Sequence, residues 1–424
     1  MENRGRALNA AIGVVLLGSW VLLVSRPAQG IPLDQRLPSL FGGSLNTSVN
    51  RFSANDAQRV LLADRLQPLS SALAVARSQA PIPSASGAFR FAWDPEIDTF
   101  VRSDQSLGSG VAERAQTLGR GAGIVSMAYT HIDFDSFEGQ PLDNLQSNQR
   151  AFSDAYLNRL NLSQSERAKF ADDRLETHLN LGLTLDQVFL TAAIGLADSV
   201  DMSMALSINR IHMQATAAAQ IVDPPSGGTG NGTGQFATNQ RGVTVGGGAG
   251  VCSTPFHCAG DGFSATAWGT GDLFLRGKWH FADTQFADLA VAGVLTLPTG
   301  NADDFLGFHD PTFTPWLIAS KPFGRLSPHL NLGYAFRSEE DVSQAQWIAG
   351  ADLMAFTWLT LNSDFLGFHD TNSDQTNDNV IQSAVGFKLN PFGQFVLAGT
   401  FQFPLNNDGL RADVIYTGQV EWTF

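Results

Sequence analysis

The chain of 424 residues combines 43% hydrophobic residues with only 16% charged residues, which excludes wholesale disorder. It contains 42 Gly, 30 Phe and 8 Trp, a composition that favours strands and tight turns over helices. The formal net charge of −14 should repel phosphate backbones, so we expect no nucleic-acid partner.

The first thirty residues have the layout of a secretory signal peptide. Arg4 and Arg6 precede an apolar run, 7–24, and the small residues Ala28 and Gly30 follow it. We therefore predict that residues 1–30 are removed and that the mature chain is secreted. The alternative is a retained transmembrane helix, for which a run of about eighteen residues is at the lower limit of length.

Residues 31–86 are polar with helical-looking pieces, and the sequence PIPSASG ends any helix there. We expect this partly helical part to be a periplasmic or plug segment. From residue 87 the sequence becomes strand-like, and we assign 87–424 to one domain. Residues 88–104 and 121–136 are the first strand-like stretches, and a polar loop fills most of 138–173.

From residue 174 onward, runs of alternating apolar and polar residues recur. In 273–281 the apolar Leu273, Leu275, Trp279 and Phe281 alternate with Phe274, Arg276, Lys278 and His280, a face that carries charge, and this is the period of a strand. A soluble sandwich or a barrel could both use such strands. We place twelve strands near 121–136, 174–197, 201–222, 265–281, 286–298, 311–321, 326–338, 344–355, 357–369, 379–390, 393–404 and 411–424, with a possible hairpin at 88–104 adding two more.

Three features favour a membrane barrel over a sandwich. Connections alternate between short turns and long polar loops, and aromatic residues gather near the strand ends. The last strand ends in Phe424, as in outer-membrane barrels whose terminal aromatic residue is read by the barrel assembly machinery. Lipid offers no hydrogen bonds to amide groups, so the sheet must close on itself. We therefore predict an all-β, transmembrane antiparallel barrel of 12 to 14 strands in a Gram-negative outer membrane, with lipid around it.

The sequence DFLGFHD occurs twice, at 304–310 and 364–370, each copy following LTL. We interpret both copies as strand exits at one rim of the barrel, with Phe at the membrane interface and Asp and His in water. A shared metal would require the two copies to meet across the mouth of the barrel, which is too wide unless the first loop folds inward, so we expect none. The predicted mouth residues, which could also capture an aromatic solute, are Asp304, Phe308, His309, Asp310, Asp364, Phe368, His369 and Asp370.

Cys252 and Cys258 are the only cysteines, and they lie in a long loop rich in Gly, Thr and Asn. In an oxidising compartment this spacing predicts a disulfide that closes a small loop. A metal site with His257 is the alternative, although metals usually need further ligands nearby. The glycine-rich tract at 227–250 lacks the Lys and Ser/Thr ending of a phosphate loop, so we interpret it as an external loop.

The stretches QTLGRGAGIVSMAYTHIDFDSFEG, GTGDLFLRGKWHF and LAVAGVLTLPTGNADDFLG resemble the outer-membrane proteins grouped under the meta-pathway of phenol degradation. The resemblance covers residues 80–424 approximately and rests on GxGDLxLxxK at 269–278 and LPTG at 297–300. Members resemble the fatty-acid and toluene transporters of the outer membrane. The resemblance implies a barrel that passes small, often hydrophobic molecules, and it brings no catalytic residues with it.

We accordingly expect a channel or transporter for small hydrophobic or aromatic solutes, without a cofactor or a resident metal. A structural or surface-binding barrel and a barrel hydrolase are the alternatives, but no GxSxG elbow, HExxH or phosphate loop is present. Lumenal polar residues could contact solute or only form ion pairs that stabilise the barrel. The residues predicted to face the passage are Arg210, Asp272, Arg276, Lys278, Asn331, Asp352 and Lys388.

Overall fold

The computed structural model describes residues 32–36, 91–94, 99–102, 107–150, 164, 174–222, 258–337, 343–371 and 379–424. Within these ranges strands dominate, and helical structure is limited to short pieces such as the turn at 33–36, η2 (Leu142–Asn144) and η3 (Ala302–Asp304). None of the described helices has the length and apolar character needed to cross a membrane.

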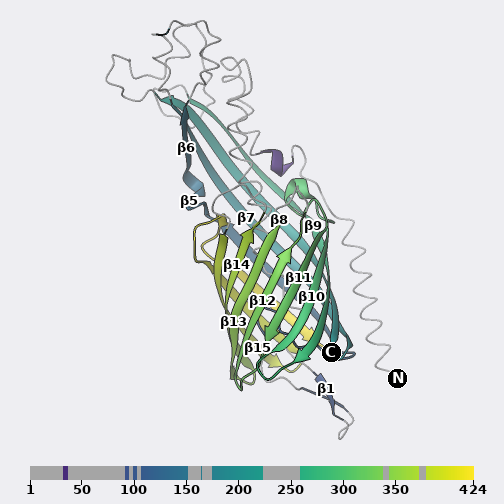
Figure 1. The fold of residues 1–424 in the computed structure, drawn as a ribbon. Coiled ribbons are helices and arrows are strands. Elements are labelled where there is room, and N and C mark those ends of the chain that lie inside the picture. Colours follow the sequence, from purple (N-terminus) through teal and green to yellow (C-terminus); the bar gives the residue numbers. More distant parts are fainter. Residues whose placement is uncertain are drawn as a thin grey trace.

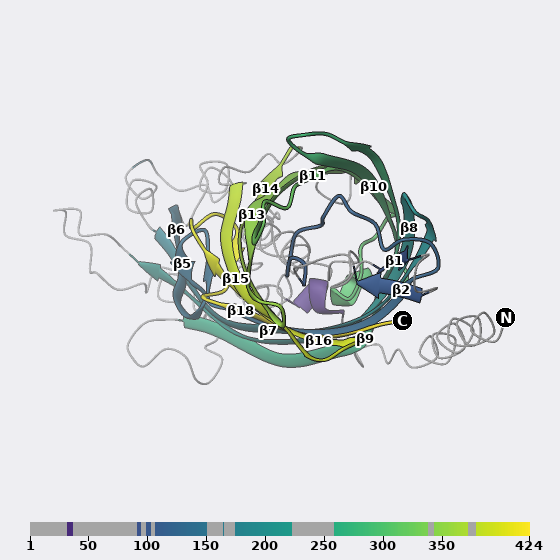
Figure 2. The same ribbon diagram turned by 90° about the horizontal axis from the view of Figure 1, so that it is seen from below.

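Twelve strands form a closed antiparallel barrel (Figures 1 and 2). Each strand pairs with its neighbour in the ring, and the ring closes where β3 pairs with β7 on one side and with β18 on the other. The barrel strands are β3 (Gly123–Phe134), β7 (Arg174–Ala197), β8 (Val200–Val222), β9 (Cys258–Asp283), β10 (Asp288–Leu297), β11 (Thr312–Ser320), β12 (Leu326–Ala335), β13 (Gln344–Phe356), β14 (Leu359–Asp370), β15 (Asn379–Phe392), β16 (Phe395–Pro404) and β18 (Ile415–Thr423).

The prediction of a closed antiparallel barrel is confirmed, and twelve is the correct strand number. The extra pair of barrel strands considered at 88–104 is wrong. That stretch does contain a hairpin, β1 (Phe91–Asp94) with β2 (Thr99–Arg102), but it forms a separate two-stranded sheet. Figure 1 shows β1 beyond the lower end of the barrel.

The two ends of the barrel differ in the length of their connections. At the lower end in Figure 1 the strands are joined by short turns, such as 198–199, 357–358 and 393–394, and we call this the short-turn end. Here Gly123 and Phe424 exchange backbone hydrogen bonds of 2.8 and 2.9 Å, which complete the seam between the first and last strands. The opposite, long-connection end carries loops and the small sheet of β4 (Ser136–Phe137), β5 (Gln140–Pro141) and β17 (Leu410–Arg411).

Side chains alternate between an apolar outer face and a polar lumen, as the sequence pattern predicts. On β14, Leu361 and Phe365 point outward and are exposed, whereas Thr360, Asn362 and Asp364 are buried inside. A lipid-facing surface and a polar interior require this arrangement. Exposed aromatic residues form a girdle around the short-turn end, including Trp279, Phe281, Phe286, Phe323, Phe356, Trp358, Phe392, Phe395, Trp422 and Phe424.

Three strands extend far beyond the others at the long-connection end (Figure 1). β7, β8 and β9 have 24, 23 and 26 residues, and β6 (Leu145–Arg150) pairs with the upper part of β7. Along β8 the polarity of the two faces reverses between Asn209 and Arg210. Below that point Met202 faces outward and Asn209 inward, and above it Arg210 faces outward and Ile211 inward. The reversal marks the outer boundary of the lipid-facing band, because polar outward side chains belong in water.

Candidate functional site

The lumen is occupied by a stretch of the chain that precedes the first barrel strand. Residues 107–119, which we call the lumenal strap, run inside the ring, where Figure 2 shows them as a dark blue trace. Leu107, Ala112, Ala115 and Leu118 have no exposed surface. The strap has no partner strand of its own, so its backbone groups must bond to the barrel wall.

The backbone hydrogen bonds of the strap connect it to several strands around the inner face of the barrel. The backbone N–H of Leu107 donates to Thr360 Oγ1 of β14 at 2.9 Å, and that of Ala115 donates to Ser320 Oγ of β11 at 3.0 Å. The N–H of Leu118 donates to the Asp201 carboxylate of β8 at 3.1 Å. Thr360, Ser320 and Asp201 lie near the short-turn ends of their strands. Both ends of the strap therefore lie close to the short-turn end, whereas Val111 in its middle reaches residues nearer the long-connection end.

Two adjacent charges in the strap bind different parts of the wall. Glu113 accepts from Arg276 of β9 and lies 3.8 Å from Lys278 of the same strand. Arg114 donates through Nε and Nη2 to Asp352 Oδ2 of β13, at 3.2 and 2.9 Å. All these side chains are largely buried, so each charge depends on its partner for stabilisation.

Where the strap leaves the lumen and continues into β3, it passes so close to β7 that position 195 of β7 must be a glycine. Gly195 of β7 faces inward, and a Cβ placed on it would lie 1.9 Å from the carbonyl oxygen of Gly119. The backbone N–H of Gly121 donates to the Gly195 carbonyl oxygen at 2.8 Å, which only a direct approach of the two backbones allows.

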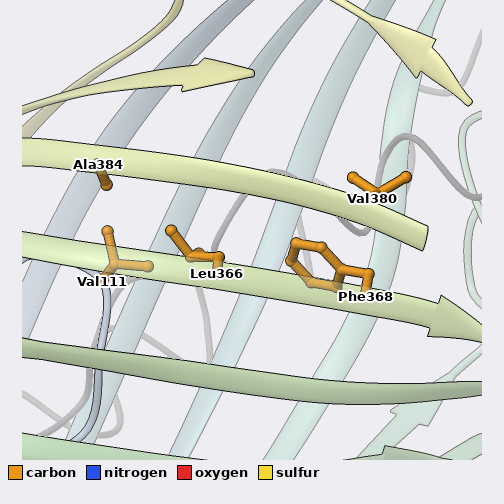
Figure 3. Close-up of a cluster of buried hydrophobic side chains, with 5 residues drawn as sticks. All are labelled: Val111, Leu366, Phe368, Val380 and Ala384. Atoms are coloured by element: carbon orange, nitrogen blue, oxygen red, sulfur yellow. The ribbon is translucent and has the colours of Figure 1, made fainter. Parts of the chain in front are cut away.

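The strap also packs against apolar residues of the wall. Figure 3 shows Val111 beside Leu366 and Phe368 of β14 and Val380 and Ala384 of β15, all of them buried. These apolar contacts fix the strap at Val111, and the ion pairs fix it at Glu113 and Arg114.

A second segment, the inward connection at residues 298–311, folds into the lumen from the long-connection end. Asp272 of β9 fixes it by accepting hydrogen bonds from the backbone N–H of Gly300 at 3.2 Å and of Phe308 at 2.8 Å. The Thr299 hydroxyl donates to the Gly271 carbonyl oxygen at 2.8 Å. The GxGDL and LPTG motifs are therefore in direct contact. Leu33, in the turn at 33–36, donates its N–H to Asp304 Oδ1 at 3.1 Å.

Between the strap and the inward connection lies a cavity of about 160 Å³. An engineered apolar cavity of similar size accommodates benzene, so one six-membered ring with small substituents fits this volume. The wall combines ten aromatic or aliphatic side chains with twelve polar or charged ones. Its apolar lining includes Val111, Phe189, Phe274, Val294, Leu306, Phe308, Trp316, Ile348, Leu366 and Phe368.

The two DFLGFHD copies meet at this cavity. Leu306 and Phe308 of the first copy and Leu366 and Phe368 of the second all line it. The interpretation of both copies as strand exits with a Phe at the membrane interface is therefore wrong for the first copy, because the inward connection carries it into the lumen. In the second copy Phe365 does face outward, as predicted. The two LTL tripeptides lie at opposite ends, since 295–297 ends β10 whereas 359–361 begins β14.

Six of the seven residues predicted to face the passage lie on the inner face, five of them buried and Arg276 partly buried, and one does not. Arg210 is wrongly placed in that prediction: its side chain is 59% exposed on the outer face, where it donates to Asp186. The polarity reversal along β8 explains the error, because above it charged residues lie outside. The six inward residues are Asp272, Arg276, Lys278, Asn331, Asp352 and Lys388.

The predicted mouth residues divide in the same way. His309 and Asp310 lie at the end of the inward connection, and His369 and Asp370 end β14. Asp364 is not at the mouth: it is buried in the middle of β14, bonded to His329. Asp304 and Phe308 are buried in the inward connection as well, instead of lying in water at the rim.

The sequence analysis did not predict the lumenal strap, and the periplasmic or plug segment at 31–86 stays a prediction. Of that range the structure describes 32–36, where Arg36 lies 5.7 Å from the ring of Phe263 on β9. The available signal was the adjacent pair Glu113 and Arg114 within a glycine-rich stretch that is too irregular for a strand. The predicted disulfide lies outside the described residues, because Cys252 is not among them. In the described part of the chain, no group of three or more His, Cys, Asp or Glu could hold a metal ion.

Comparison with known proteins gives fold likenesses only. No protein-family model and no curated protein matches the sequence. Among solved structures, an outer-membrane channel from Pseudomonas putida F1 is similar with a TM-score of 0.42 and 12% identity, over 73% of this chain and 98% of that one. A TodX monoaromatic hydrocarbon channel mutant gives 0.31 and 8%, over 73% and 91%. A FadL homologue from Pseudomonas aeruginosa gives 0.32 and 10%, over 72% and 90%.

Proposed function

We propose that the protein is an outer-membrane channel for small hydrophobic or aromatic solutes. The observation that carries this proposal is the 160 Å³ cavity between the lumenal strap and the inward connection. Ten aromatic and aliphatic side chains gather on its wall, inside a lumen that is otherwise mainly polar. A wide aqueous pore would not need such a cavity, whereas a carrier of single-ring molecules would.

The location in an outer membrane is part of the same proposal. The exposed apolar band, the aromatic girdle and the closed ring support a lipid-embedded barrel. In that setting residues 1–30 serve as the signal peptide, and Phe424 is the residue that the assembly machinery reads. Kinship with the outer-membrane proteins of the meta-pathway type is proposed on the GxGDL and LPTG motifs, which contact each other through Gly271 and Thr299.

The strap makes passage dependent on rearrangement. A solute in the cavity faces Val111 and Glu113 of the strap on one side and Leu306 and Phe308 of the inward connection on the other. Movement of either segment would open the cavity toward one end of the barrel. We therefore propose a carrier-like channel in which the solute occupies a binding site between these two segments during passage.

The test is solute uptake by cells. The initial rate of uptake of a radiolabelled single-ring solute at low concentration is compared between cells that produce the protein and cells that produce Val294→Trp, which fills the cavity from β10. We expect uptake above background with the unchanged protein and with the control variant, but not with Val294→Trp. Gly277→Ala is the control, because a Cβ at Gly277 meets nothing within 4 Å. Equal uptake with Val294→Trp in a correctly folded barrel would refute a passage through the cavity.

A further inference from the structure

Polar atoms without partners distinguish the cavity wall from an ordinary apolar pocket. Asn209 of β8 and Asn331 of β12 both line the cavity, and each is 2% exposed. The Oδ1 atom of each is buried and has no hydrogen-bond partner. A buried carbonyl oxygen without a partner is costly, so such atoms indicate that something else supplies the missing bond.

The orientation of both amides is fixed by what their nitrogen atoms donate to. Asn209 Nδ2 donates to the Leu306 carbonyl oxygen at 2.8 Å, and Asn331 Nδ2 donates to the Glu113 carbonyl oxygen at 3.2 Å. Turning either amide over would place its oxygen against another oxygen. On these two residues the atoms left for a solute are therefore hydrogen-bond acceptors, whereas Arg276 Nε on the same wall is a buried donor atom without a hydrogen-bond partner.

The two acceptors lie on different parts of the ring, since β8 and β12 are separated by three strands. Asn209 is hydrogen-bonded to the inward connection and Asn331 to the strap, so each asparagine links one of these two segments to the cavity wall. Thr312 Oγ1 and Gln187 Oε1, which are also buried and without partners, lie on the wall as well. The Thr312 hydroxyl can donate or accept.

The charges around the cavity balance. Arg276 and Arg337 face Glu113 and Asp272, which gives no net charge. A carboxylate solute has no donor hydrogen for the two Asn oxygens and would add a net charge to a wall whose charges balance. A pure hydrocarbon would leave the two Asn oxygens unsatisfied. A neutral solute with an O–H or N–H group satisfies the wall.

We propose that Asn209 and Asn331 make the cavity selective for neutral single-ring solutes that donate hydrogen bonds. This inference rests on the proposed function, whose cavity it refines from hydrophobic solutes in general to ring compounds with a hydroxyl or amino substituent. The two asparagines determine specificity through their carbonyl oxygens, while the aromatic wall supplies the affinity for the ring.

The test uses three molecules of nearly equal size: p-xylene, p-cresol and p-toluidine. Their binding to the purified full-length protein in detergent is measured by equilibrium dialysis, with empty micelles subtracted. One hydrogen bond gives roughly a threefold to tenfold gain in affinity. We expect p-cresol and p-toluidine to bind at least threefold more tightly than p-xylene.

The variant Asn209→Leu with Asn331→Leu removes both acceptors, and we expect it to bind the three molecules equally or to prefer p-xylene. Asn362→Leu is the matched control, because Asn362 is a buried lumenal residue that does not line the cavity. It should keep the preference for donors. If the double variant fails to fold, the single variants test each acceptor separately.

The outcomes separate the two proposals. Equal binding of all three molecules to the unchanged protein would overturn the selectivity and leave the cavity as a hydrophobic site. A donor preference that survives in the double variant would overturn the role of the two asparagines. If none of the three molecules binds, the proposed function itself is contradicted.

Discussion

Arg276 on β9 donates a hydrogen bond to Glu113 of the lumenal strap, with 2.5 Å between Nη1 and Oε1. The side chains are 13% and 8% exposed, so the pair is shielded from water. Arg114, the next residue, is bound to Asp352 on β13, four strands further around the ring. Glu113 and Arg114, which are adjacent in sequence, thus attach the strap to two distant parts of the barrel wall.

Glu113→Gln should loosen the strap. The change leaves Arg276 and Lys278 without the carboxylate that both approach, and breaking a buried ion pair costs about 3–5 kcal/mol. Detaching the strap relieves this cost without unfolding the barrel. We expect faster amide hydrogen exchange at residues 107–118 and unchanged exchange in β13 to β16. Asp133→Asn, on the outer face of β3, is the control. Unchanged exchange in the strap would contradict its attachment through Glu113.

Lys388 and Glu421 should behave as a coupled pair. Lys388 Nζ on β15 lies 2.7 Å from Glu421 Oε1 on β18, and both side chains are almost fully buried. Lys388→Met leaves a buried carboxylate alone and should destabilise the barrel by about 3–5 kcal/mol, whereas adding Glu421→Leu should restore much of that. Urea unfolding monitored by electrophoretic mobility measures both. Additive losses in the double variant would show that the pair is not coupled.

Gly333→Val should reduce solute binding. Gly333 of β12 faces inward, and a Cβ there would lie 2.6 Å from the indole of Trp316, which lines the cavity. The indole must move toward the cavity, and overpacking of this kind costs about 1–3 kcal/mol. We expect p-cresol to bind about tenfold more weakly. Gly277→Ala is again the control, and unaltered binding by Gly333→Val would contradict the position of Trp316.

The small sheet of β4, β5 and β17 at the long-connection end should resist local unfolding better at low pH than at neutral pH. Burial, followed by a hydrogen bond with Asp413, raises the pKa of Asp135 above its ordinary value. A raised carboxyl pKa gives stability that is fully present below the unfolded value, about 3.9, and is lost as pH rises through the folded value. Asp135→Asn imitates the protonated carboxyl. We expect it to slow proteolysis of the rim at neutral pH and to have no effect at pH 3.5. Asp143→Asn, which is exposed, is the control, and an effect of Asp135→Asn that is equal at both pH values would contradict this origin.

Strand alternation and turn length were enough to predict the barrel. Leu273, Leu275 and Trp279 alternate with inward residues because a lipid-facing sheet admits no other period, and the short turns identify one end without any structure. Arg210 was misplaced because a charged residue was taken to be lumenal at any height. Beyond the lipid-facing band, polar and charged residues lie on the outer face instead. The sequence of one strand does not show where that boundary lies.

The site was harder to predict than the wall. The strap and the inward connection have no regular period, and their positions depend on single contacts such as Leu107 with Thr360 and Phe308 with Asp272. The repeat of DFLGFHD did carry a signal, since Phe308 and Phe368 meet at one cavity. Seeing this required the first copy to fold inward, which depends on the acceptor Asp272 in a different strand.

Single-channel conductance in planar bilayers tests the central claim, that the chain's own residues 107–119 fill the lumen. The purified protein is compared with a variant in which residues 107–117 are replaced by a glycine–serine sequence of equal length. We predict that the unchanged protein gives no steady conductance and that the variant gives a steady open level. A large, steady conductance from the unchanged protein would contradict the account.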